Sequence, residues 1–508
     1  MSPTHPERAW SAGGRQAVYR WGLVLFLFLL YSVMAFSRYQ LPDKALFGGD
    51  EWEYQSMAVN FATGHGLKFG GILPFNEYAF DTSRSTPEYY AQFEEAGKQG
   101  GTYDFYRTPG YPFVLGLIYK VFGVRPHVAI AMQVLWVAAV SALLPILGRT
   151  LLGWRGFIAG VVGGAVFFVG AVRNVQELMT EGLIIVACFG VTWAWAYVCR
   201  RPSSRIAPAL LGLSLAAALL VKGSLIFLPP LFLGYMVLRT LTDRTYRLTA
   251  ILTVLLFLAA PLACYSAYAT QRAHSFIVLS TQTNVVLLDG NNELMRQDGF
   301  WHPEWRDNPA SFYNQLSRKS PELSPTAMVA RFYWAHPGDL PRILANKLAF
   351  AAGGGTRTAR LMWLFMGLMI LSIGVSLSEA TMTRPVWRYA TAFGLLAIVF
   401  LLNNSFVTLF LLFLALAAMG CLIRPVRSQF AAVWRNPDLM GLVLIPVNFL
   451  LLTLVTFGYN RYVMPGNFVL ALLTGYMAIR LAERLLFVEN LPRESIIARL
   501  FSQLRRTA

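Results

Sequence analysis

The sequence has little charge: only 14% of its 508 residues are Asp, Glu, Lys or Arg, whereas soluble domains carry about 25%. With 56% hydrophobic residues and a mean hydropathy of +0.49, this scarcity excludes an ordinary soluble protein. Apolar runs near the roughly 20 residues that cross a bilayer as a helix recur from Trp21 to the C-terminus. The predicted fold class is therefore an all-α polytopic membrane protein.

Cysteine is also scarce, and no C-x-x-C pair occurs. Because all four cysteines (Cys188, Cys199, Cys264 and Cys421) lie within or at the ends of apolar runs, we expect small buried side chains and no disulfides. There is no internal repeat and no nucleotide-binding motif. The net charge of +17 is spread between the apolar segments and forms no single patch, so nucleic acid is not an expected partner.

The apolar runs predict twelve membrane-spanning helices. Their ranges are 19–37, 128–148, 156–172, 178–198, 206–221, 224–238, 249–268, 360–377, 388–403, 405–423, 439–457 and 462–480. The first run has no small-residue cleavage site behind it, which favours a retained span over a signal peptide.

Arginine marks every second connection between these spans. Lys and Arg oppose the translocation of short loops, so these connections and both termini are predicted to be cytoplasmic. They contain Arg149, Arg155, Arg200, Arg201, Arg205, Arg239, Arg244, Arg247, Arg384, Arg388, Arg424, Arg427 and Arg435, followed by the tail from Arg480. The short external connections hold only Arg173, Lys222 and Arg461, three basic residues that this rule leaves unexplained.

Two long loops, 38–127 and 269–359, are then external. The first holds ten of the 26 acidic residues, and it contains two segments predicted to be helices on the bilayer surface, 51–62 and 111–122. The segment 76–104 between them is polar and rich in Gly, Ser and Tyr, so we expect it to be irregular.

The second loop contains a β-branched and polar run at 281–292 and an amphipathic stretch at 327–350, which is predicted to be an interfacial helix. The cytoplasmic tail 481–508 is predicted to anchor on the inner leaflet through a basic amphipathic helix at 494–506. We expect residues 1–508 to form a single transmembrane domain.

The adjacent acids Asp50 and Glu51 lie just outside the first span. One carboxylate can serve as a general base, while its neighbour orients an acceptor or holds a metal. The alternative is helix capping, with Asp50 as N-cap and Glu53 as its partner three residues later. His65, His302 and His336 are also external, but their spacing fits no known metal site.

Several motifs in order resemble the GT-C membrane glycosyltransferases. They are GGDEWEYQSMA (48–58), GHG (64–66), YRTPGYP (106–112), MTEGL (179–183), LVKGSL (220–225), LPP (228–230), GNN (290–292), the stretch 336–347 and YNRYVMP (459–465). The similarity is greatest to the bacterial relatives of dolichyl-phosphate-mannose protein mannosyltransferases and of the lipid A aminoarabinose transferase. It implies the GT-C fold.

The resemblance implies site residues one by one. Asp50 matches the catalytic base, and Glu51 would position the acceptor or share a metal. A divalent cation is left open, with Asp50 and Glu51 as its ligands if one is used. The match at GNN assigns Asn291 and Asn292 to a substrate loop.

Other charged residues complete the predicted site. Glu181 lies near the outer end of the fourth span, where an acid is costly and usually functional, although an ion pair with a nearby base is the simpler alternative. Lys222, Arg461 and Arg107 are external cations suited to binding a donor phosphate and stabilising it as it departs, with lipid-headgroup contact as the alternative.

The resulting prediction is an inverting glycosyltransferase of the bacterial cytoplasmic membrane, working at its external face. Its donor would be a polyprenyl-phosphate-linked hexose or pentose, and its acceptor lipid A, a wall polysaccharide or a protein. The alternative is a transporter or flippase of polyprenyl-linked sugars. Transporters place charged groups and broken helices near the midplane, whereas here the acids gather in one external loop.

Overall fold

The computed structural model describes residues 7–38, 50–70, 100–103, 105–352, 357–381, 424–458 and 463–485, together with single residues at 95, 394, 415 and 418. Within these ranges the only β-type pairing is one isolated bridge between Phe69 and Thr102. The helices are α1 (Glu7–Arg38), α2 (Asp50–Ala62), α4 (Gly110–Phe122), α5 (Pro126–Ala171), α6 (Glu181–Arg200), α7 (Ile206–Val221), α8 (Leu228–Asp243), α9 (Leu248–Ala273), α10 (Gln282–Asp289), α11 (Phe312–Lys319), α12 (Pro325–Ala335), α13 (Asp339–Ala352), α14 (Arg357–Thr381), α17 (Arg424–Arg435), α18 (Pro437–Val455) and α20 (Asn467–Leu485). Short 3-10 turns are η3 (Val172–Val175), η4 (Gly223–Leu225), η5 (Glu293–Arg296), η6 (Pro303–Arg306) and η7 (Met464–Gly466).

Seven helical segments among the described residues are long and apolar enough to cross a membrane. They are Val18–Ser37, Pro126–Val175, Glu181–Arg200, Gly223–Asp243, Leu248–Ala273, Pro437–Val455 and Met464–Arg484, with shorter apolar helices at Gly110–Phe122, Ile206–Val221 and Arg360–Ile373. The predicted all-α polytopic class is confirmed. The count of twelve stays a prediction, because spans 388–403 and 405–423 lie outside the described residues, as does the tail helix 494–506.

Helix α5 contains two of the predicted spans, folded back on each other. Gly153 interrupts it with φ 68°, a left-handed conformation that favours glycine. A Cβ at Gly156 would lie 2.0 Å from the Gly148 carbonyl oxygen, and one at Gly160 would lie 2.4 Å from that of Leu144. Glycines spaced by four residues therefore let the two halves pack backbone to backbone, as small residues do between membrane helices.

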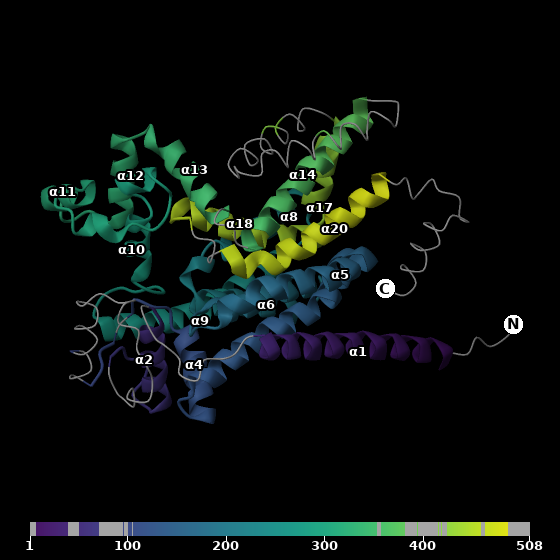
Figure 1. The fold of residues 1–508 in the computed structure, drawn as a ribbon, viewed down its shortest axis with the longest axis horizontal. Helices are drawn as coiled ribbons and strands as arrows, with labels where there is room; N and C mark the ends of the chain where they lie inside the picture. Colours follow the sequence, from purple (N-terminus) through teal and green to yellow (C-terminus); the bar gives the residue numbers. More distant parts are fainter. Residues whose placement is uncertain are drawn as a thin grey trace.

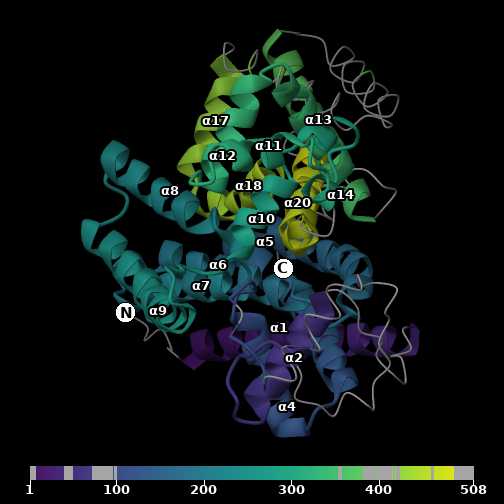
Figure 2. The ribbon, with the colours of Figure 1, turned by 90° about the vertical axis from the view of Figure 1, so that its left-hand side faces the viewer.

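The described loop segments gather at one end of the bundle. In Figure 1, α1, α5, α6 and α9 run along the long axis, whereas α2 lies across it at the end opposite the marked N-terminus. Helices α10 to α13 are found at the same end. Seen from there, α10 lies between α2 and the group α11 to α13 (Figure 2). The two long loops thus meet on one face.

The structure corrects two boundaries. The interfacial helix predicted at 327–350 is wrong as a single element, because it divides into α12 and α13. His336, before Pro337, leaves the helical region with φ −131° and ψ 60°, since proline disfavours helix in the residue that precedes it. The fourth span begins at Glu181 and not at residue 178, so Glu181 is the first residue of α6. The run at 281–292 forms α10.

Candidate active site

Helix α2 carries the acidic motif. Its first turn contains Asp50, Glu51 and Glu53, and acids are stabilised at a helix N-terminus by the free N–H groups and the helix dipole. The helix is held close to α4 because Gly116 has no side chain: a Cβ there would lie 2.9 Å from the Ala58 carbonyl oxygen. The acids are therefore placed on a rigid pair of helices.

Arg107 binds two of these acids. Its Nη2 lies 2.5 Å from the Asp50 Oδ1, and its Nε donates to the Glu53 carboxylate. The side chains of Arg107 and Glu53 are buried, at 6% and 8% exposure, whereas that of Asp50 is 41% exposed. Asp50 is thus the acid of this trio that solvent or a substrate can reach.

Two contacts fix the segment that carries Arg107. The Thr108 hydroxyl donates to the Val221 carbonyl oxygen at 2.9 Å, and a Cβ at Gly110 would lie 2.7 Å from the Leu220 carbonyl oxygen. Burial alone would lower the pKa of Arg107, but the charges of Asp50 and Glu53 outweigh it and raise that pKa well above its usual range. The guanidinium remains charged.

Lys222 also contacts Tyr54. Its Nζ donates to the Tyr54 hydroxyl at 3.2 Å and lies 5.9 Å from the ring centre. The guanidinium carbon of Arg107 lies 5.5 Å from the same ring. Two of the three predicted phosphate ligands therefore converge on one tyrosine beside Asp50. Arg461, the third, lies outside the described residues.

Glu51 has a different environment from Asp50. It is 2% exposed, and its Oε1 accepts a hydrogen bond from the Leu178 backbone N–H at 3.1 Å. Glu181, 4% exposed, follows shortly after Leu178 at the start of α6. The adjacent acids thus face different partners, and Glu51 ties α2 to the entry of the fourth span.

Asn291 and Asn292, which the resemblance assigns to a substrate loop, are buried in the structure. They are 3% and 0% exposed. The Asn291 amide donates to the carbonyl oxygens of Leu287 and Val455, and its Oδ1 accepts from Tyr333 and Lys347. Asn292 caps η5 through the Leu294 N–H. Their polar atoms are occupied within the fold.

Lys347 was missed as a polar centre by sequence reasoning, because it lies in a stretch that fits an amphipathic helix. It is fully buried, and its Nζ donates to Asn291 and to the Leu454 carbonyl oxygen at 2.8 and 2.9 Å. Burial lowers its pKa to about 7. This lysine joins the second long loop to the end of α18, which lies four residues before the stretch 459–462 that contains Arg461.

Asp289 is a second residue that sequence reasoning missed. Asp289 is 1% exposed. Its carboxylate accepts hydrogen bonds from the indole N–H groups of Trp301 at 2.9 Å and Trp305 at 3.0 Å, and from the Arg306 guanidinium. The signal available in the sequence was the run DGNN (289–292), followed closely by two tryptophans and an arginine.

No group of three His, Cys, Asp or Glu side chains that could hold a metal occurs within the residues described. Asp50 and Glu51, the predicted ligands of an optional cation, are engaged with Arg107 and with the Leu178 amide respectively.

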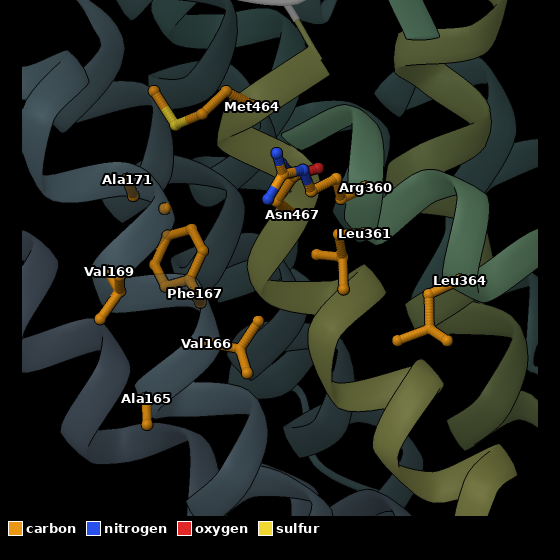
Figure 3. A pocket seen from close by; sticks show the side chains of 11 residues that line it. Ala165, Val166, Phe167, Val169, Ala171, Arg360, Leu361, Leu364, Met464 and Asn467 are labelled. Atoms are coloured by element: carbon orange, nitrogen blue, oxygen red, sulfur yellow. The ribbon is translucent and has the colours of Figure 1, made fainter. Parts of the chain in front are cut away.

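An apolar cavity of about 490 Å³ lies between the C-terminal end of α5 and the N-terminal ends of α14 and α20. Its walls are mostly aliphatic and aromatic, whereas Arg360 and Asn467 supply polar groups. Figure 3 shows these two side chains next to each other, with Val166, Phe167 and Leu361 below them. Ala171, on its wall, precedes the short stretch that leads to Leu178 and the acids.

The fold and site together define a helical membrane protein with a charged centre at one end of its bundle. Residues 106–265, less than half of the chain, match the family model of dolichyl-phosphate-mannose-protein mannosyltransferase. The predicted resemblance to GT-C membrane glycosyltransferases is thereby confirmed. The matched residues include Arg107, Glu181 and Lys222.

ArnT from Cupriavidus metallidurans bound to undecaprenyl phosphate is among the similar solved structures. The match covers 94% of this chain and 82% of that one, at 16% identity and a TM-score of 0.35, which is too loose to assign a ligand. No curated protein matches the sequence significantly.

Proposed function

We propose that this protein transfers a sugar from a polyprenyl-phosphate carrier to an acceptor at the external face of a bacterial cytoplasmic membrane, with both termini cytoplasmic. The family model supports glycosyl transfer. The observation that carries the mechanism is Asp50, a partly exposed acid held by a buried arginine at the start of a rigid surface helix.

In the proposed step, the Asp50 carboxylate takes the proton of the acceptor hydroxyl. The acceptor oxygen attacks C1 of the sugar, and the bond from C1 to the phosphate oxygen breaks with inversion. The electron pair leaves on the polyprenyl phosphate. A positioned general base of this kind contributes about 10² to 10⁴ in rate.

The departing phosphate would be stabilised by Lys222 and Arg107, with Arg461 as a third candidate. Arg107 Nη1 is buried and has no hydrogen-bond partner among the described residues, so it retains a donor for a phosphate oxygen while Nε and Nη2 hold the acids. Such a contact would link departure of the phosphate to the position of Asp50.

The polyprenyl tail needs an apolar path from the lipid. The cavity between α5, α14 and α20 provides one, with Arg360 and Asn467 as its polar members (Figure 3). Its position at the outer helix ends suits a lipid whose phosphate lies at the membrane surface. The acceptor would be lipid A, a wall polysaccharide or a protein.

The second candidate is a flippase of the same lipid-linked sugar, and one assay separates the two. Proteoliposomes containing the purified protein would receive labelled polyprenyl-phosphate sugar together with an extract of envelope lipids and glycans. Transfer predicts that the label moves to the extract while polyprenyl phosphate is released. Translocation of intact donor without cleavage would contradict the proposal and favour the flippase.

A further inference from the structure

Asp289 holds three side chains of the second external loop in fixed positions. Its two oxygens accept from Trp301, Trp305 and Arg306. A nearly fully buried carboxylate that receives donors on both oxygens leaves its partners little rotational freedom. We call this group of four side chains, Asp289, Trp301, Trp305 and Arg306, the platform.

Two members of this platform face outward. Trp305 is 8% exposed, but Trp301 is 42% exposed, and so is the Arg306 side chain. The indole N–H of Trp301 is bound to Asp289 at its edge, which leaves the ring available to a ligand. An exposed tryptophan that is held rigidly beside an arginine presents an aromatic face and a cation together.

The platform lies beside the catalytic segment of the first loop. The Thr281 backbone N–H donates to the Phe105 carbonyl oxygen at 2.9 Å, which ties the start of α10 to the residue before Tyr106. Burial raises the pKa of Tyr106. The charge of Arg107 lowers this pKa, those of Glu53 and Asp50 raise it, and that of Arg306 lowers it. Tyr106 therefore lies within electrostatic reach of both Asp50 and Arg306. It also stacks under Arg107, whose guanidinium carbon is 4.9 Å from the ring centre.

The platform belongs to the part of the second loop that contains α10 to α13. Of these helices, α11 projects furthest from the bundle (Figure 1). The flat ring of Trp301 suits the C–H face of a sugar, and the exposed guanidinium of Arg306 suits a phosphate or carboxylate substituent.

We infer that Trp301 and Arg306 form an acceptor subsite that binds a saccharide carrying an anionic group, with Asp289 as their positioning residue. The inference rests on the proposed function and narrows its acceptor to anionic glycans. The subsite lies on the second long loop, whereas Asp50, the proposed base, lies on the first.

The test is saturation-transfer NMR on the full-length protein in nanodiscs, with glucose 6-phosphate, glucuronate and glucose as probes. Trp301→Ala should weaken binding of all three sugars, and Arg306→Gln should weaken the two anionic sugars alone by about tenfold. Trp301→Phe, which keeps an aromatic face, should retain most of the signal. Trp334→Ala, at a tryptophan that is 90% exposed on α12, is the matched control and should change nothing.

Unchanged saccharide binding in Trp301→Ala and Arg306→Gln would overturn the inference, as would equal effects of Arg306→Gln on glucose and the anionic sugars. Asp50→Asn separates this inference from the proposed function. If that variant abolishes transfer while neither platform variant affects binding, the subsite is wrong and the function stands. If it transfers normally while binding depends on Trp301, the mechanism is wrong and the subsite stands.

Discussion

Replacing Arg107 with methionine should destabilise the protein, chiefly through Glu53. The guanidinium holds Glu53 at a buried position and Asp50 at an exposed one. Breaking a buried ion pair from one side costs about 3 to 5 kcal/mol, because the remaining charge is left without compensation. The ion pair between Arg107 and Asp50 is screened by solvent and should contribute at most about 1 kcal/mol to the free energy of unfolding.

A double-mutant cycle tests this account. The free energy of unfolding would be measured in mixed micelles for Arg107→Met, Glu53→Gln and the double variant. Glu53→Gln should recover about 1 to 3 kcal/mol in the Arg107→Met background, because it removes the uncompensated charge. Asp50→Asn should recover little.

Two results would refute this reasoning. The first is a loss below about 1 kcal/mol in Arg107→Met, the range of an exposed pair. The second is additivity of the two substitutions, which would mean that Arg107 and Glu53 are not energetically coupled in the folded protein.

Two further predictions concern packing and pH. Gly160→Ala should cost about 1 to 3 kcal/mol in unfolding experiments because its Cβ meets the Leu144 carbonyl oxygen, whereas Gly190→Ala, with nothing within 4 Å, should cost nothing. Lys347→Met should gain stability relative to wild type at pH 6 and lose about 3 kcal/mol of that advantage by pH 9. Burial lowers the folded pKa of Lys347 to about 7 from 10.5, so its cost is complete below pH 7 and fades as pH rises toward 10.5.

Each of these has a clear contrary outcome. Equal effects of alanine at the two glycines would mean that the halves of α5 do not pack at Gly160. A stability difference between wild type and Lys347→Met that stays constant from pH 6 to pH 9 would mean that the amine is not buried.

Much of the fold was predictable because membrane helices need long apolar runs, and such runs can be recognised directly in the sequence. Surface helix α2 and the entry to α4 followed from the Gly and Pro signals near Gly64 and Pro109. The division of α12 from α13 was missed although Pro337 and Gly338, a dipeptide typical of turns, lie at the break.

The site was only partly predictable. Asp50 was predicted from its acidic neighbour and the family resemblance, and Arg107 and Lys222 were predicted because the charge rule for cytoplasmic loops leaves them unexplained. The structure brings all three together near Tyr54. The pairing of Arg107 with Glu53 was not predicted, because the two residues are distant in sequence and meet only when α2 packs beside α4. The substrate-loop role of Asn291 stays a prediction, and its burial was not predicted because a motif match carries no information on exposure.

The most direct test of the central claim is the rate of sugar transfer in proteoliposomes by Asp50→Asn, measured beside Asp307→Asn, an exposed acid of the second long loop. The account predicts a loss of about 10² to 10⁴ for Asp50→Asn, with normal expression and unfolding, and no loss for Asp307→Asn. Full transfer by Asp50→Asn would contradict it.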